Sequence, residues 1–186
     1  MMSRIRKRSG LARGVVALAF AACIAAIGSA SAATTTGTLA VTARVGGFCV
    51  FSTWPFGPGN YTLNFGVYTP AGGNLDVQTS LGVRCSSGVP FQVALNGGNT
   101  GNVSNRQMSS TTVPTEKLAY QLYTDAGRTI VWGDGTGGTA VATGTGGGFL
   151  VLRSFTVYGR VPDSTANQGA APLNNYQDTV TVVVTY

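Results

Sequence analysis

The nine residues 178–186, DTVTVVVTY, alternate strictly between two faces. Val180, Val182, Val184 and Tyr186 share one face, and the opposite face carries mainly threonine. A period of two residues with β-branched side chains predicts a half-buried β-strand. No further strand follows it in the sequence, so the question is which segment pairs with it. Either another part of this chain or another molecule must cover the edge.

Similar alternation recurs along the rest of the chain, in a composition rich in Gly, Thr, Val and Asn that opposes helices. Turn signals return about every ten residues, which predicts roughly seven to nine strands. We therefore expect an all-β fold, an antiparallel β-sandwich of immunoglobulin type, with a closed barrel as the alternative. The alternating stretches are Leu39–Val45, Cys49–Phe51, Leu63–Val67, Leu75–Cys85, Phe91–Leu95, Leu118–Leu122 and Phe149–Arg160, and in the last of them Phe149, Val151, Phe155 and Val157 share a face.

Two stretches are predicted to be loops. Residues 99–112 are polar, and residues 133–148 are dominated by glycine. The glycine-rich run lacks the G-x-x-x-x-G-K-[ST] pattern of a phosphate-binding loop, and no helix follows it. A flexible connection between strands is the favoured interpretation of this run.

Residues 1–32 are predicted to be a secretory signal peptide. Basic residues precede an apolar run from Gly14 to Gly28, and the small residues SASAA follow it. This order, with cleavage after Ala32 or Ala33, is typical of export signals. The apolar run is short for a membrane span, and an uncleaved anchor is the alternative.

Removal of the signal changes the electrostatics of the chain. Five of its 12 basic residues lie in the first 32 residues, which leaves seven against six acidic residues. The mature protein is therefore nearly neutral, and its high overall pI is no evidence for binding to nucleic acid.

Cysteine usage points to an oxidising compartment. Cys23 leaves with the signal, and Cys49 and Cys85 remain as an even pair at inward positions of two predicted strands. We interpret them as a disulfide between strands that face each other across the sandwich, with two buried thiols as the alternative.

The residues offer little material for catalysis or for metal binding. The sequence contains no histidine, so Ser-His-Asp and Cys-His arrangements are impossible. The carboxylates are few and scattered, which leaves glycoside hydrolysis formally open. We expect no enzyme activity, no cofactor and no metal site.

Four aromatic residues fall between Phe48 and Phe56, namely Phe48, Phe51, Trp54 and Phe56. A core strand with an ordered loop is the simpler interpretation. An exposed aromatic surface that contacts a neighbour or an abiotic surface is the alternative.

The N-terminal part of the mature chain is a second alternating segment, and it could pair with the free edge of the last strand. Residues 33–46 begin with a polar tail and then place Leu39, Val41, Ala43 and Val45 on one face. Insertion of this segment beside the last strand of another copy would satisfy both edges, which is donor-strand complementation. Such a head-to-tail contact does not close, so it propagates a fibre.

Several blocks of the sequence carry a resemblance to a known family. They are GGFCV after the N-terminal alternation, LNFGVYTP, LGVRCSSGVPFQVALNGG, LAYQLYTDAGRTIVWGDGTGGT, FTVYGRVPDSTANQGA and NYQDTVTVVVTY. Together they cover nearly all of the mature chain. The sequence is identified as similar to the spore coat U domain family, which includes the subunits of Csu-type archaic chaperone–usher pili.

This resemblance implies an incomplete immunoglobulin-like antiparallel β-sandwich completed by donor-strand exchange, with residues 47–186 as the pilin domain. It implies a periplasmic chaperone and an outer-membrane usher as partners, and a cell-surface pilus made of this and other subunits for attachment and biofilm formation. Cys49 and Cys85 would form the family disulfide. The donor residues would be Leu39, Val41, Ala43 and Val45, and the acceptor groove and chaperone-binding edge would be lined by Val180, Val182, Val184 and Tyr186.

Two other functions compete with this hypothesis. A secreted coat or binding protein with a self-complete sandwich would pair its N-terminal strand within its own chain. An extracellular hydrolase would depend on scattered carboxylates such as Asp125, Asp134 and Asp163.

Overall fold

The computed structural model describes residues 34–53 and 57–186. The predicted signal peptide, together with Trp54 and Phe56 of the aromatic stretch, lies outside the described residues. The chain divides into two units at Ala43 and Arg44, and each is considered by itself. In the first unit, residues 34–43 are exposed and belong to no helix or strand.

The regular elements of the second unit, residues 44–186, are almost all β-strands. This unit contains one short helix, α1 (Thr165–Gln168), and one 3-10 turn, η1 (Gly98–Thr100), among the described residues. The strands are β1 (Cys49–Thr53), β2 (Gly57–Pro58), β3 (Leu75–Cys85), β4 (Pro90–Leu95), β5 (Arg106–Ser110), β6 (Lys117–Tyr123), β7 (Ala142–Thr145), β8 (Arg153–Val161), β9 (Tyr176–Gln177) and β10 (Val182–Thr185).

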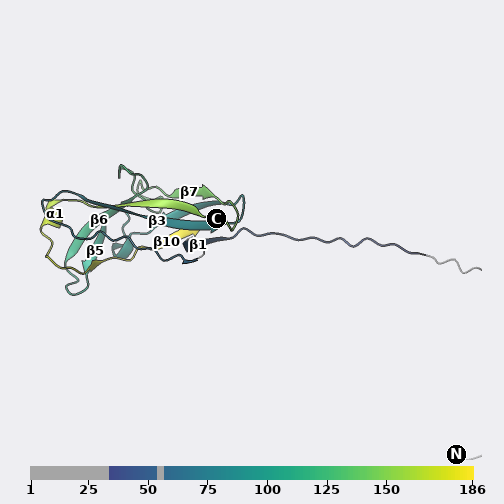
Figure 1. The fold of residues 1–186 in the computed structure, drawn as a ribbon, viewed down its shortest axis with the longest axis horizontal. Helices are drawn as coiled ribbons and strands as arrows, with labels where there is room; N and C mark the ends of the chain where they lie inside the picture. The colour runs from purple at the N-terminus through teal and green to yellow at the C-terminus, as the bar shows by residue number, and fades with distance from the viewer. Residues whose placement is uncertain (1–33, 54–56) are drawn as a thin grey trace, which may run out of the picture. The chain divides into compact units, whose positions relative to one another are not determined.

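These strands form two antiparallel sheets (Figure 1). The larger sheet has the order β2-β1-β3-β8-β6-β5-β9, and the smaller has the order β10-β4-β7. Consecutive strands β9 and β10 lie at the edges of different sheets, so the chain crosses between the sheets through residues 178–181. The predicted all-β, immunoglobulin-like sandwich is confirmed.

The longest ladder joins β3 to β8 and defines the two ends of the domain. Leu75 pairs with Val161 at one end of this ladder, and Val83 pairs with Arg153 at the other. Helix α1 lies beyond the first end, and β1 lies beside the second (Figure 1). Inward side chains of both sheets form one apolar core that includes Leu81, Val83, Phe91, Val93, Leu95, Leu118, Leu122, Trp132, Val157 and Val161.

Three residues expected inside are outside. Val67 is exposed because residues 59–69 form no strand, so the predicted alternation stops at Phe65. Phe149 and Val151 are also exposed, because β8 begins only at Arg153 and the residues before it form a turn.

Two strands lie where loops were predicted. In β5 the inward positions are Arg106, Met108 and Ser110, so a buried arginine and serine hide the alternation. In β7 the predicted flexible glycine run pairs with β4. Gly144 is needed there, because a Cβ atom would lie 2.6 Å from the Phe91 ring.

The predicted disulfide between Cys49 and Cys85 is confirmed, but the expected geometry is wrong. The two residues are register partners on the adjacent strands β1 and β3, with Cα atoms 4.1 Å apart. The bridge therefore joins neighbours within one sheet instead of crossing the sandwich.

Candidate strand-binding groove

A groove of about 970 Å³ opens along one side of the sandwich. Its floor is the inner face of β3, β8 and β6, where Leu81, Val157 and Leu122 lie. One wall is residues 61–68, and the other runs from Ala170 through β9 to Val182 of β10. The groove is thus an opening into the apolar core between the two sheets.

The wall formed by β10 carries a free strand edge. β10 pairs with β4 on one side and has no second neighbour among the described strands. Val182 and Val184 face the core from this edge, while Val183 faces outward. An edge with unpaired N–H and C=O groups beside apolar side chains is a template for another strand.

The opposite wall is an extended segment, residues 60–68, which we call the strap. Tyr61, Leu63 and Phe65 point into the core, whereas Thr62 and Asn64 are exposed. The Tyr61 hydroxyl donates to the backbone oxygens of Ser52 and Gly82 at 3.0 and 2.8 Å. The side chains of the strap therefore anchor it to the core.

The backbone of the strap forms no strand ladder, and its Gly66 N–H donates to the Asn64 side-chain oxygen at 2.8 Å within the strap itself. Among the described residues, no backbone–backbone hydrogen bond involves residues 60–68. Leu63 and Phe65 pack against Gly159 of β8, where a Cβ atom would lie 2.6 Å from Leu63 Cδ2 and 2.9 Å from Phe65 Cζ. Phe65 also meets the Tyr120 ring edge-on, with centroids 5.9 Å apart. The groove thus lies between two extended segments that both have backbone groups available.

The far end of the strap is fixed by a carboxylate. Asp163 accepts from the Tyr68 hydroxyl at 2.6 Å and from the backbone N–H groups of Ala71 and Gly73. The hydrogen bond from Tyr68 is the main cause that lowers the pKa of Asp163 to about 2. Burial, and then the same hydrogen bond, raise the pKa of Tyr68 to about 12.

A second carboxylate, Asp178, helps to form the wall that leads into β10. It accepts from the Tyr120 hydroxyl at 2.6 Å and from the Asn99 N–H at 2.7 Å. Burial and the bond to Asp178 raise the pKa of Tyr120. A Cβ atom at Gly98 would lie 2.1 Å from Asp178, so this approach requires glycine. Asp178 thus ties the start of the last strand to the floor of the groove.

A fully buried arginine supports the loop between β4 and β5 that carries Asn99. The Arg106 guanidinium donates to the carbonyls of Leu95, Asn96, Val103 and Trp132, at 2.7 to 3.2 Å. Burial lowers its pKa. The same loop pairs with the wall, because Asn96 N–H donates to the Thr181 carbonyl at 3.0 Å. Arg106 therefore organises the groove from beneath without reaching it.

The structure brings only some of the predicted site residues to the groove. Val180 and Val182 line it, whereas Val184 packs on the core and is not part of the lining. Tyr186 is 57% exposed and lies in a shallow depression beside Pro90 and Thr145.

The predicted donor residues present their side chains to solvent. Leu39, Val41 and Val45 are 87%, 84% and 97% exposed, and Ala43 is exposed too.

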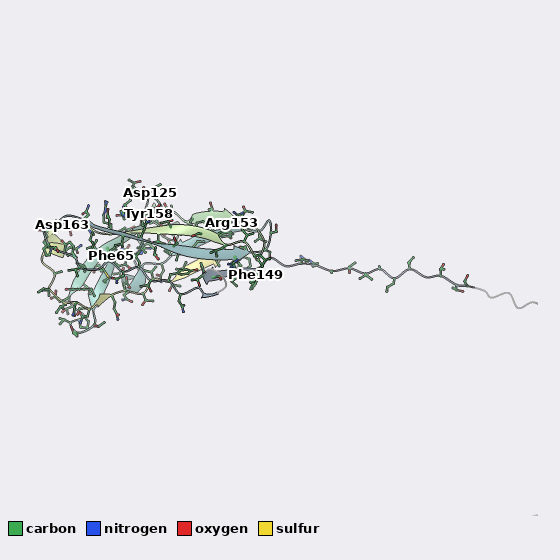
Figure 2. All side chains as sticks on the ribbon, viewed as in Figure 1. Phe65, Asp125, Phe149, Arg153, Tyr158 and Asp163 are labelled. Atoms are coloured by element: carbon green, nitrogen blue, oxygen red, sulfur yellow. A yellow bond between two sulfur atoms is a disulfide. The ribbon has the colours of Figure 1, made fainter. Side chains whose placement is uncertain are left out.

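The three carboxylates considered for hydrolysis are each bonded within a local structure. Asp125 accepts from the N–H groups of Thr129 and Ile130, and Asp134 accepts from Thr136. Figure 2 shows Asp125 and Asp163 well apart. In the part of the chain that the structure describes, no cluster of His, Cys, Asp or Glu side chains could hold a metal ion. None of the helices in that part is long and apolar enough to span a membrane.

The fold and the groove place this protein in a class: immunoglobulin-like β-sandwiches with an open groove beside an unpaired strand edge. Within that class, the chain belongs to the Spore Coat Protein U domain family, which matches residues 35–183. It is 34% identical over 187 residues to Protein U of Myxococcus xanthus, covering 92% of this chain and 96% of that protein. The family resemblance found in the sequence is confirmed.

A solved structure has the same fold. It is the CsuC–CsuE chaperone–tip adhesion subunit pre-assembly complex from archaic chaperone–usher Csu pili of Acinetobacter baumannii, with 26% identity and a TM-score of 0.53. The match covers 76% of this chain but only 40% of the other chain, so this protein spans less than half of that relative's length.

Sequence reasoning missed the strap and the Tyr120–Asp178 pair as parts of the groove. The alternation of Tyr61, Leu63 and Phe65 was visible, but only the structure shows that this segment lacks a strand partner. The pairing of Tyr120 with Asp178 joins residues 58 positions apart, and no local pattern marks it.

Proposed function

We propose that this protein is a structural subunit of a secreted adhesive pilus assembled by the chaperone–usher pathway. Subunits polymerise by donor-strand complementation, as a homopolymer or with other pilus subunits, and the fibre supports surface attachment and biofilm formation. The observation that carries the proposal is the open apolar groove between the strap and the β10 edge.

The donor is the exposed N-terminal segment of another copy, with Leu39, Val41, Ala43 and Val45 directed into the groove. Each large side chain that leaves water contributes roughly 1.5–3 kcal/mol before ordering costs. The backbone of the donor hydrogen-bonds to β10, and the strap offers unpaired groups on the other side. Apolar burial and backbone hydrogen bonding thus hold the subunits together whatever surface the pilus attaches to, and neither interaction requires catalysis.

Export through the periplasm precedes assembly in this proposal. A periplasmic chaperone lends a strand to the groove, and an outer-membrane usher exchanges that strand for the donor of the next subunit. The likeness to a chain from a chaperone–subunit complex supports this order.

The test changes one donor residue in the full mature chain. Because Val41 is exposed, Val41→Asp leaves its own sandwich intact and puts a carboxylate into the neighbour's groove. We expect it to abolish fibres seen by electron microscopy. Thr42→Asp, on the opposite face of the donor, is the matched control and should still polymerise.

A second variant tests the groove. Val182→Asp should also block fibres, whereas Val183→Asp, which faces outward, should not. Mixing Val41→Asp with Val182→Asp should give capped dimers, because one intact donor and one intact groove remain. Fibres from Val41→Asp alone would refute the donor assignment.

A secreted coat or binding protein with a self-complete sandwich is the second candidate, and the description of the family as Spore Coat Protein U domain favours it. It predicts a stable monomer in which Val41→Asp changes nothing in the oligomeric state.

A further inference from the structure

An apolar patch remains exposed at one end of the domain and is not part of the groove. This end patch consists of Phe48, Phe149, Leu150 and Val151, which are 49%, 48%, 75% and 40% exposed. The rings of Phe48 and Phe149 stack, with centroids 6.2 Å apart. Contiguous exposed apolar residues from separate parts of a chain mark an interaction surface more often than scattered ones do.

The turn that carries the end patch is held rigidly from beneath. Arg84 is fully buried and donates to the carbonyls of Phe149 and Leu150 at 3.3 and 2.9 Å. The Gly148 N–H donates to the Cys85 carbonyl at 3.2 Å. A buried arginine thus fixes a backbone whose side chains point to solvent. Apolar anchors that are ordered before binding lose little entropy on association.

The position of the patch relates it to the predicted donor. Phe48 directly precedes Cys49, which pairs with Cys85 at the β1 end of the β3–β8 ladder. Phe149 stacks on Phe48 at this end. Figure 2 shows Phe149 and Asp163 at opposite ends of the domain. Phe48 follows Val45 by three residues, which span at most about 11 Å of extended chain.

We propose that the end patch is a subunit–subunit contact surface whose occupant is a second copy of this chain. The proposal rests on the function proposed above. A donor whose last inserted residue is Val45 brings Phe48 to the mouth of the neighbour's groove, because the connection is so short. The patch of one subunit then packs against the neighbour's surface at that mouth.

The direction of the donor identifies the facing surface. A donor antiparallel to β10 places Val45 near Asp178, where that wall of the groove begins. The neighbour's residues 170–174 and the loop with half-exposed Val113 lie at that end. Charges also match, because exposed Arg153 flanks the patch and Asp163 lies at the facing end.

The experiment uses Phe149→Ser/Leu150→Ser in the full mature chain. We expect fibres to form through the unchanged donor and groove, but to dissociate at least tenfold faster in guanidinium chloride, as followed by size-exclusion chromatography. The matched control is Ile130→Ser, a half-exposed apolar residue in another turn, which should dissociate like wild type. Unchanged dissociation of the double variant would overturn the proposal, as would loss of attachment to a hydrophobic surface with dissociation unaltered.

A cross-link locates the contact. The photo-crosslinking amino acid p-benzoylphenylalanine at position 150 should capture residues 111–115 or 170–174 of the neighbouring subunit, as mapped by mass spectrometry. Cross-links confined to the same subunit would refute the contact. The two proposals can fail separately. Fibres formed by Val41→Asp would refute the donor assignment. If Val41→Asp forms no fibres but Phe149→Ser/Leu150→Ser fibres dissociate like wild type, only the end-patch proposal is refuted.

Discussion

At the scale of single residues, two carboxylates hold the walls of the groove in place. Asp163 secures the strap through Tyr68, and Asp178 secures the start of the last strand through Tyr120. Both bonds join a tyrosine hydroxyl to a carboxylate at 2.6 Å. The walls of the groove are thus positioned by polar contacts at their ends.

The Tyr68–Asp163 bond predicts a defined pH dependence of stability. Because the pKa of Asp163 is lowered to about 2 from an unfolded value of about 3.9, its contribution is lost as pH falls from 4 towards 2. Because the pKa of Tyr68 is raised to about 12 from about 10, its contribution is lost as pH rises through that range. The melting-temperature difference between wild type and Tyr68→Phe should therefore be constant from about pH 5 to 9 and shrink on both sides. A difference that is flat from pH 2 to 12 would contradict this assignment.

At the scale of elements, the strap is held to the sandwich by its own side chains, which pack closely on a glycine of β8, and not by a strand ladder. Gly159 lies in the middle of β8, where a side chain would meet Leu63 and Phe65. Glycine inside a strand often marks such a close approach.

Gly159→Ala should therefore displace the strap. We expect a loss of about 1–3 kcal/mol in the free energy of unfolding, because the added methyl group overpacks the contact. Urea unfolding measures it. Gly169→Ala is the control, because Gly169 has a right-handed helical conformation and a Cβ atom there would be 3.6 Å from its nearest neighbour. Equal effects of the two changes would show that the contact at Gly159 is not close.

Alternation predicted the elements whose inward positions are apolar. Leu81 and Val83 in β3, or Leu118 and Leu122 in β6, face the core as the period of two requires. The pattern failed at β5, because its inward Arg106 is polar and is buried through hydrogen bonds to carbonyls far away in the sequence, such as those of Leu95 and Trp132. The groove itself could be anticipated only as an unpaired last strand, because its second wall is defined by tertiary contacts.

At the scale of the whole molecule, the sandwich is stapled where its first strand joins the larger sheet. The Cys49–Cys85 bridge closes a loop with a sequence separation of 36 residues. That loop contains β2, the strap and most of β3. The staple therefore restrains the strap, which has no backbone–backbone hydrogen bond among the described residues.

Removing the bridge should cost about 4 kcal/mol, on the chain-entropy estimate for a loop of this length. This is a large part of the roughly 5–15 kcal/mol that stabilises an ordinary domain. Urea midpoints of wild type and Cys49→Ser/Cys85→Ser should differ accordingly, and a reductant should shift only the wild type. Identical midpoints would show that the bridge stabilises nothing.

The same bridge determines how a fibre of these subunits would bear load. Tension arriving along residues 44–47 meets Phe48, whose carbonyl accepts from the Ser86 N–H, and then Cys49. The sulfur–sulfur bond passes the load directly to Cys85 at the end of β3. From there the pull is shared along the nine residue pairs between β3 and β8. The strap, which precedes β3 and has no strand ladder, is bypassed and would stay slack while the thread is stretched.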